Sequence, residues 1–334
     1  MKAVAPSASR TKSNRKVYGY LLVLLLLIAA PYALQPFHTF LLTRILFLAL
    51  ASMSFVLLQG FGGMTSLAQA TFYGVAGYVV GIGAVRYGWP LYMTLPAALV
   101  ASTVVAAAFA GIAVRTRGNY FLMMTLALSQ LFYGIALQWT KITGGFNGIT
   151  GINPPVLFGY SLDGTVPMYF FALVPVALSF FLLSRLVSSP FGIALQGIRD
   201  DEQRMAALGY NVQFYRFAAI TISGIFAGLA GVIAAYFYGL IGPDMVGLNA
   251  AVTIVFTSLL GGVDRFQGSF IGALVYVLLE DIGSQFTPRY KTLIGVCFVL
   301  IVLFLPKGIT GLKGNPLQWV KTALSPKAGQ SSRS

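Results

Sequence analysis

The segment YRFAAITISGIFAGLAGVIAAYFYGLI, residues 215–241, carries one charged side chain, Arg216, and is otherwise almost entirely apolar. Its apolar residues follow one another without the alternation of period two that marks a half-buried strand. About 20 apolar residues in a helix span the hydrocarbon core of a bilayer. The segment therefore predicts a helix that crosses a membrane.

The composition extends this prediction to the whole chain. Of 334 residues, 57% are hydrophobic and only 9% are charged, with a mean hydropathy of +0.81, whereas a soluble domain has about 25% charged residues. In lipid the backbone must satisfy its own hydrogen bonds, which leaves helices or a closed barrel, and the long apolar runs favour helices. We expect an all-α, polytopic membrane helix bundle of about ten transmembrane helices. The predicted spans are 17–34, 40–58, 64–85, 90–114, 119–139, 167–186, 215–241, 250–262, 269–283 and 291–305, of which 64–85 and 250–262 are Gly-rich and are candidates for broken or tilted helices.

The basic residues predict the orientation, because Lys and Arg gather in cytoplasmic loops. With the N-terminus cytoplasmic, 17 of the 22 basic residues fall on the cytoplasmic side, so we expect both termini there. This divides the chain into a cytoplasmic tail 1–16, a membrane domain 17–312 and a cytoplasmic tail 313–334. The net charge of +14 is then an orientation signal, and no Lys/Arg run interleaved with aromatics indicates nucleic acid.

Chemical groups for catalysis are scarce in the sequence. The single histidine, His38, and the single cysteine, Cys297, provide no metal-ligand cluster and no disulfide, and we expect no cofactor. No nucleotide-binding G-x-x-x-x-G-K-[ST] motif and no nucleophile–base pair is present, so we expect no enzyme activity. On the predicted spans no acid reaches the midplane, since Glu280 lies at an outer end, and Arg44 lies near a span end from which it can reach the interface. Active transport by such a bundle would need energy from another subunit.

The acids concentrate in a predicted cytoplasmic loop, 187–214, with the sequence GIRDDEQRMAALG at 197–209. Ser189 and Pro190 predict the start of a first short helix, Asp200 or Asp201 the cap of a second, and Gly209 its end. The apolar side of these helices is predicted to comprise Phe191, Leu195, Ile198, Met205 and Leu208. Two capped helices with exposed acids indicate either a docking surface or a solvated connector.

Two further groups of residues each have two interpretations. Polar residues within the spans either line a path for a small solute or make interhelical hydrogen bonds; they are Thr125, Ser129, Gln130, Tyr133, Thr253 and Thr257.

The outer loop 140–166 contains KITGGFNGITGINPP, in which turns rather than a helix are expected. It is either a receiving surface for an extracytoplasmic partner or a connector. Its candidate residues are Gly145, Asn147, Gly148, Thr150 and Gly151. Elsewhere, Gly224, Gly228 and Gly231 share one helix face and predict close helix packing.

Three motifs, TGGFNGITGI, SPFGIALQGIRDDEQRMAALGYNVQFYR, and ISGIFAGLAG followed by LGGVDRFQGSFIGALV, together resemble the permease family for branched-chain amino acids in ATP-binding cassette importers, the LivM type. The similarity extends over residues 55–312. It implies a permease of the bacterial plasma (inner) membrane. The implied partners are a second homologous permease subunit, two cytoplasmic ATP-binding cassette ATPases, a periplasmic substrate-binding protein and membrane lipid.

The resemblance assigns the acidic loop to ATPase coupling, with candidate residues Pro190, Phe191, Gly192, Ile198, Arg199, Asp200, Asp201, Glu202 and Gly209. The chain departs from the family pattern at Ile193 and Gln196, where basic residues are common, and at SLAQA, 66–70, where the family has a histidine-containing stretch. Relatives carry urea, short amides or aromatic acids, so the substrate is a branched-chain amino acid or a related small solute. A self-sufficient channel or secondary carrier is the alternative class.

Overall fold

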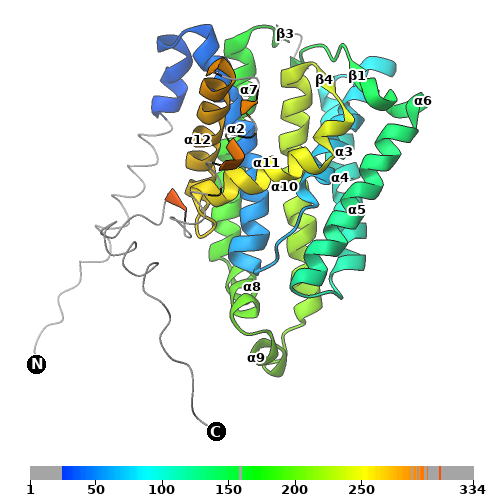
Figure 1. The fold of residues 1–334 in the computed structure, drawn as a ribbon, viewed down its shortest axis with the longest axis vertical. Helices are drawn as coiled ribbons and strands as arrows, with labels where there is room; N and C mark the ends of the chain where they lie inside the picture. The colour runs from blue at the N-terminus through cyan, green and yellow to red at the C-terminus, as the bar shows by residue number, and fades with distance from the viewer. Residues whose placement is uncertain are drawn as a thin grey trace, which may run out of the picture.

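Helices that run between the two ends of a single bundle form most of the protein (Figure 1). The computed structural model describes residues 25–157 and 160–286, together with 289–290, 292, 294–296, 299 and 308–309. Residues 25–33 are helical. The long helices are α2 (Pro36–Val56), α3 (Gln69–Gly81), α4 (Leu91–Ala113), α5 (Asn119–Gln138), α7 (Thr165–Ser188), α10 (Val212–Tyr238), α11 (Leu248–Gly261) and α12 (Phe266–Phe286). Two of them continue as π-helical turns, η1 (Leu57–Phe61) after α2 and η2 (Ile82–Arg86) after α3.

Shorter elements connect these helices. At one end of the bundle are α8 (Pro190–Asp200) and α9 (Glu202–Ala207). At the opposite end are α6 (Thr140–Thr143), η3 (Gly145–Asn147), β1 (Ile149–Thr150), β2 (Val156–Leu157), β3 (Tyr160–Ser161), β4 (Leu240–Ile241) and η4 (Pro243–Met245). The strands form two small antiparallel pairs, β1 with β4 and β2 with β3. The acidic loop and the Gly-rich loop therefore lie at opposite ends of the bundle, as the predicted topology requires (Figure 1).

Seven helical segments of the described residues are long and apolar enough to cross a membrane. They correspond to seven of the ten predicted spans, from 40–58 through 269–283 but without 64–85. The predicted span 17–34 begins, and the span 291–305 largely falls, outside the described residues, so the total of ten is not confirmed. The tails 1–16 and 313–334 also lie outside the described residues.

The predicted span 64–85 is interrupted. Its helix begins at Gln69, because Gly63 adopts a left-handed conformation with φ of +65° and ends the helix that precedes it. Residues 63–66 carry no helical turn. This stretch is followed by α3 and its continuation η2, so that the predicted span is helical only from Gln69 to Arg86.

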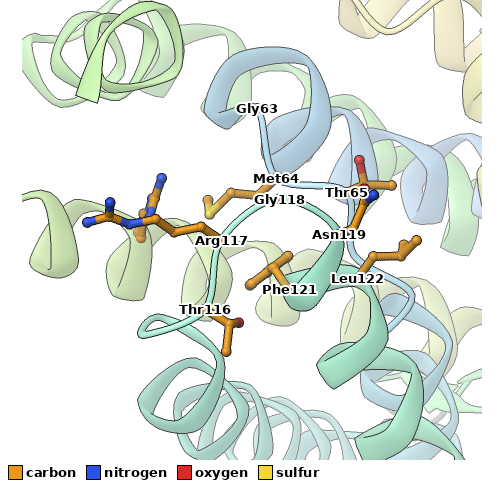
Figure 2. A pocket seen from close by; sticks show the side chains of 10 residues that line it. Gly63, Met64, Thr65, Thr116, Arg117, Gly118, Asn119, Phe121 and Leu122 are labelled. Carbon is orange, nitrogen blue, oxygen red and sulfur yellow. The ribbon is translucent and has the colours of Figure 1, made fainter. Parts of the chain in front are cut away.

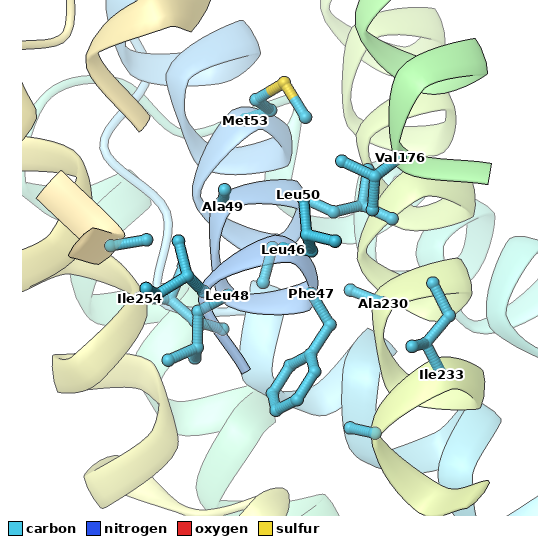
Figure 3. Close-up of a cluster of buried hydrophobic side chains, with 14 of the residues drawn as sticks. Leu46, Phe47, Leu48, Ala49, Leu50, Met53, Val176, Ala230, Ile233 and Ile254 are labelled. Carbon is cyan, nitrogen blue, oxygen red and sulfur yellow. The ribbon is translucent and has the colours of Figure 1, made fainter. Parts of the chain in front are cut away.

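The core of the bundle surrounds α2, whose apolar window is 83% buried. Phe47, Leu50 and Met53 are essentially inaccessible to solvent, and they pack with Val176 of α7 and Ile233 of α10 in one apolar cluster (Figure 3). A helix that is apolar on all sides is stable only when other helices or lipid surround it. The position of α2 among its neighbours satisfies that requirement.

Small residues let α10 approach α3 and α4 closely, as the glycine spacing predicted. A Cβ atom at Gly224 would lie 2.2 Å from the Cβ of Ala106, and one at Gly231 would lie 1.9 Å from the carbonyl oxygen of Tyr73. Ser102 of α4 donates a hydrogen bond of 2.7 Å to the carbonyl oxygen of Gly224. The absence of side chains on this face of α10 is therefore what sets the distance between the three helices.

Candidate functional site

The pair α8 and α9 has the helix caps that the sequence predicts. Ser189 accepts a hydrogen bond from the backbone nitrogen of Gly192 at the start of α8, where Pro190 is the first residue. Of the two candidate aspartates, Asp201 caps α9, with its Oδ1 accepting from the backbone nitrogen of Arg204 at 3.0 Å. Gly209 has φ of +88° and ends the second helix. The local fold of this segment is thus fixed by its own sequence.

The apolar side of α8 holds the pair against the bundle. Leu195 and Ile198 are buried, and Leu195 packs in one cluster with Leu58, which precedes the helix break, and Met64, which lies within it. A Cβ at Gly192 would lie 2.3 Å from the carbonyl oxygen of Val187, so the turn into α8 accepts only glycine. Leu208, which was also predicted on the apolar side, is 67% exposed. The apolar side is therefore buried along α8 but reaches the protein surface at the end of α9.

The three adjacent acids are not equally exposed, which corrects the prediction of a uniformly exposed acidic surface. Asp200 pairs with its neighbour Arg199 and keeps a side-chain exposure of 66%. Asp201 pairs with Arg204 across 3.3 Å in addition to capping α9. Glu202 turns toward the bundle, where only 23% of its side chain is exposed.

Glu202 joins α9 to two other parts of the protein. Its Oε2 lies 2.8 Å from Arg216 of α10, and its Oε1 lies 3.0 Å from Arg117 in the turn between α4 and α5. Arg216 is largely buried, with 14% of its side chain exposed. Since the arginines come from segments about a hundred residues apart, neither segment alone indicates this shared pairing.

Arg199 joins α8 to the end of the central helix. Its Nη1 donates a hydrogen bond of 2.6 Å to the carbonyl oxygen of Gly60 in the π-helical turn η1. Its aliphatic part lies against Gly63, where a Cβ would be 2.7 Å from the Cγ of Arg199. The acidic loop 187–214, to which the resemblance assigns ATPase coupling, therefore contacts the helix break directly.

The structure assigns Thr125 and Ser129 to interhelical hydrogen bonds, one of the two interpretations that the sequence left open. Thr125 accepts from the backbone nitrogen of Leu67, and Ser129 donates to the carbonyl oxygen of Leu67. Ser129 lies about 15 Å along α5, at 1.5 Å per residue. Non-helical backbone at membrane depth is tolerated only where its polar groups are satisfied, and these two side chains satisfy Leu67.

The other four predicted path residues are dispersed. Gln130 is exposed on α5, and Tyr133 is half-buried beside Gly247. Thr257 is buried and bonds to carbonyl oxygens of its own helix α11. Thr253 lies 3.3 Å from the hydroxyl of Tyr276 on α12. The six residues therefore do not converge on one cavity in this conformation.

An ion pair inside the bundle was missed by the sequence analysis. Arg44 lies about 12 Å into α2, at 1.5 Å per residue, and its Nη2 donates to Oε2 of Glu280 at 2.7 Å. Arg44 was expected to lie near a span end and to reach the interface, and the structure adds that its side chain pairs with Glu280 of α12. The two residues are 236 positions apart, and each helix alone shows only an isolated charge.

The Gly-rich loop at the opposite end forms turns, as predicted. Gly145, Gly148 and Gly151 all have positive φ. A Cβ at Gly148 would lie 2.2 Å from the carbonyl oxygen of Ile241, so glycine lets the loop approach β4. Thr150 follows in β1 and pairs with Leu240, while Asn147 ends η3. This pairing fixes the loop to the end of α10.

A cavity of about 130 Å³ opens beside the helix break, at the end of the bundle that carries α8 and α9 (Figure 2). The break supplies one wall, the turn between α4 and α5 a second, and Arg216 of α10 a third. Within the described part of the chain no three His, Cys, Asp or Glu side chains gather to hold a metal ion. The polar groups available in this cavity are arginine, threonine and asparagine side chains with backbone amides.

The structure has seven membrane-length helices, a non-helical stretch at residues 63–66 and a surface pair, α8 and α9, that contacts this stretch. Together these define a multi-pass helical membrane protein of the transporter type. Comparison with known families specifies the class further. The family described as branched-chain amino acid transport system, permease component, matches residues 38–305. The chain belongs to this family of permease components of ATP-binding cassette transport systems.

Individual relatives agree with this assignment at low identity. The chain is 24% identical to the high-affinity branched-chain amino acid transport system permease protein LivM of Salmonella typhimurium, over 98% of this chain and 81% of the relative. It is 24% identical to the permease protein LivH of the same kind of system in Escherichia coli K12, covering 79% of this chain and 91% of LivH. It is 26% identical to the autoinducer 2 import system permease protein LsrC of Escherichia coli SMS-3-5, over 88% of this chain and 82% of LsrC. No solved structure matches the chain.

Proposed function

We propose that this chain is a transmembrane permease subunit of an ATP-binding cassette importer that carries branched-chain amino acids or a related small solute across the bacterial inner membrane. Two separate cytoplasmic ATPases supply the energy by binding α8 and α9. A second homologous permease lies beside the chain, and a periplasmic binding protein delivers the solute. The chain itself carries out no covalent chemistry, and its termini lie in the cytoplasm.

The observation that supports coupling most directly is the set of three links from α8 and α9 into the bundle. Arg199 reaches Gly60 at the end of the central helix, and Glu202 reaches Arg117 and Arg216. A force applied to the exposed surface of these two short helices is transmitted to α2, α5 and α10 through charge-assisted hydrogen bonds, which are the stronger kind. A simple surface connector would not need three such links.

The broken helix is where such a movement would act on the solute path. Discontinuous membrane helices form the solute sites of many transporters. Here Leu195 packs on one side of the break, and the break in turn is held by Thr125 and Ser129 of α5. Displacement of α8 would therefore strain the contacts between residues 62–68 and α5, which provides a route from ATP hydrolysis to alternating access.

The exposed position of Gln130 supports a path at the outer face of α5. It lies about 17 Å along the helix, at 1.5 Å per residue, and is exposed within this single chain. An amide facing lipid near the middle of a bilayer lacks hydrogen-bond partners, and such side chains usually face a bundle interior or an aqueous cavity. We assign this face to the contact with the second permease, where Gln130 and Tyr133 border the solute.

The Gly-rich loop has the properties of a receiving surface for the binding protein. Its strand β1 is held by pairing with β4, and it presents Phe146 with 83% of its surface exposed. A pre-formed loop loses little conformational freedom on binding.

The decisive experiment is co-purification and reconstitution with ATP-binding cassette ATPases and a periplasmic binding protein from the same organism. A stable complex that accumulates leucine in vesicles only with ATP and binding protein supports the proposal, and the double change Asp200→Lys/Asp201→Lys should dissociate the ATPases. Transport by the purified chain alone, without nucleotide, would instead establish a channel or secondary carrier.

A second candidate differs only in the solute. LsrC, named as an autoinducer 2 permease, is 26% identical to the chain, so the relatives do not select one substrate class. Uptake by the assembled complex of leucine, valine, urea, a short amide and an aromatic acid would decide among these solutes.

A further inference from the structure

The connection from α10 to α11 turns back into the bundle instead of staying at its end. A Cβ at Gly81 of α3 would lie 2.9 Å from the side chain of Ile241, whereas one at Gly74 would lie 3.1 Å from the carbonyl oxygen of Met245. Gly74 precedes Gly81 by about 10 Å of helix, at 1.5 Å per residue. The connection therefore runs back along α3, away from the Gly-rich loop, and α11 begins below β4 in the view of Figure 1.

This path brings an acid into a membrane-length segment. Asp244 follows the first residue of Pro243–Gly261, one of the seven segments long and apolar enough to cross a membrane. Asp244 is exposed in the single chain, and its carboxylate takes part in no ion pair and no hydrogen bond within the described residues. Ionisable side chains in membrane segments are costly, face a bundle interior or an aqueous path, and mark functional sites.

The described fold does not use the Asp244 carboxylate for its own stability. Tyr78 of α3 is close enough for this carboxylate to act on its hydroxyl electrostatically, yet the hydroxyl makes no hydrogen bond within the described residues. Asp201 and Glu202, by contrast, cap a helix and pair with two arginines. An unpaired charge removed from water is unfavourable, so the carboxylate requires a partner from outside the described chain.

The residues around Asp244 belong to the face already assigned to the solute path. Gly247, one turn later in the chain, lies against Tyr133 of α5, where a Cβ would be 3.0 Å from the Cδ2 atom of the ring. Gln130 is one helical turn from Tyr133 on the same helix, and it is exposed, as is Asn249 at the start of α11. One acid and two amides therefore lie where α5 meets α11.

The chemistry of these groups matches the charged end of a free amino acid. A carboxylate holds an ammonium group by charge-assisted hydrogen bonds. The amides of Gln130 and Asn249 both donate and accept, so they suit the carboxylate of the same molecule. Leu248, which is 46% exposed, adds apolar surface beside them for an aliphatic side chain.

We propose that Asp244 binds the ammonium group of the amino acid in the path between the two permeases. This assignment rests on the proposed function, because the importer and its second permease supply the solute and the opposite wall of the path. It adds that the permease itself selects for a positively charged nitrogen, so that discrimination among solutes does not rest with the binding protein alone.

The test is calorimetric titration of the assembled complex, both permeases with the ATPases, in nanodiscs of uncharged phosphatidylcholine and without binding protein. L-leucine and L-leucinamide keep the ammonium group, whereas 4-methyl-2-oxopentanoate keeps the carboxylate and the branched chain but lacks it. We expect the first two to bind and the oxo acid to bind about tenfold more weakly or worse, because a hydrogen bond between charged groups is lost. Binding of the oxo acid as tight as that of leucine, or no binding of leucine, would overturn the proposal.

Variants of Asp244 separate ligand binding from a role in assembly. Asp244→Asn should weaken leucine and leucinamide about tenfold and leave the oxo acid unchanged, and Asp244→Glu, which keeps the charge, should restore most of the loss. The control Asp163→Asn changes an exposed acid of the outer loop that is hydrogen-bonded to Ser161 and should leave all three affinities unchanged. Equal weakening of all three ligands by Asp244→Asn, or failure of the second permease to co-purify, would show that the carboxylate shapes the assembly and would refute the site.

Uptake by the same complex in vesicles separates this proposal from the proposed function. ATP-dependent uptake of leucine by the wild type, with the affinity of Asp244→Asn unchanged, would refute the site and leave the importer standing. Leucine binding that depends on Asp244, in a complex that transports leucine without ATP, would support the site and refute the importer.

Discussion

At the scale of single residues, three adjacent acids have three separate uses. Asp200 is paired locally and mostly exposed, Asp201 caps α9, and Glu202 is turned inward to two arginines. The sequence shows only that the acids are adjacent. Their different roles follow from the direction in which each side chain leaves the turn between α8 and α9, and so substitutions at neighbouring positions should have unequal effects.

Glu202→Gln should lower the thermal stability of the purified protein in detergent. The neutral amide no longer balances the largely buried Arg216, and the loss of a charged partner costs about 1–3 kcal/mol. Asp200→Asn is the matched control, since its exposed pair contributes at most about 1 kcal/mol. Equal melting temperatures for the two variants would show that the pairing of Glu202 with the arginines does not stabilise the fold.

At the scale of elements, the α8–α9 pair and the broken helix act on each other through contacts distant in sequence. The helix caps of the pair were predictable because each cap residue lies within three positions of the amide that it binds. The hydrogen bond from Arg199 to Gly60 was not predictable, because it joins residues 139 positions apart. The proposed coupling role of α8 and α9 therefore depends on the tertiary hydrogen bond between Arg199 and Gly60.

Arg199→Met should uncouple the assembled transporter. Methionine keeps the aliphatic contact with Gly63 but cannot donate to the carbonyl oxygen of Gly60, so we expect ATP hydrolysis to persist while solute uptake falls about tenfold, as for the loss of one charged hydrogen bond. Arg204→Met is the control, because Arg204 is 77% exposed and pairs only within α9. Uptake by Arg199→Met at the rate of the control would exclude the hydrogen bond from Arg199 to Gly60 as a route of coupling.

Ser129→Ala should loosen the helix break. The carbonyl oxygen of Leu67 and the hydroxyl of Thr71 both lose Ser129 as a partner, at a cost of about 1 kcal/mol for each lost hydrogen bond. Hydrogen exchange at residues 63–71 should accelerate relative to the core of α2. Ser188→Ala, which changes an exposed serine bonded only within α7, should leave the exchange of this segment unchanged; faster exchange in both would make the effect non-specific.

At the scale of the whole molecule, a buried ion pair joins helices from opposite ends of the chain. Arg44 of α2 and Glu280 of α12 have side-chain exposures of 23% and 18%. Charged residues within membrane helices are costly unless paired. The pair therefore specifies how α12 packs against the central helix α2.

Glu280→Gln should destabilise the bundle by about 1–3 kcal/mol, because it leaves the largely buried Arg44 without its counter-charge. The double change Arg44→Met/Glu280→Met should recover most of that loss, since a buried ion pair can be replaced by apolar side chains of similar volume. Chemical unfolding in mixed micelles measures both variants. A double variant less stable than Glu280→Gln would mean that the two charges do not act as a pair.

The orientation of the bundle is tested by labelling from each side of the membrane. In a Cys297→Ala background, Phe146→Cys and Leu208→Cys place thiols at residues that are 83% and 67% exposed at opposite ends of the structure. A membrane-impermeant maleimide should label position 146 on intact spheroplasts and position 208 only after permeabilisation. The reverse pattern would place the coupling helices outside the cell and refute ATPase docking.

The sequence by itself determined the fold class, seven of the spans, the caps of α8 and α9 and the turns of the Gly-rich loop. These depend on local composition and on contacts a few residues apart, which the order of residues displays directly. The tertiary structure alone decided that Thr125 and Ser129 support a broken helix, that Arg44 finds Glu280, and that Glu202 and Arg199 connect the surface pair to the bundle. Apart from the pairing of Glu202 with Arg216, which are 14 positions apart, each of these joins segments more than 50 residues apart, and the choice of partner depends on how the helices pack.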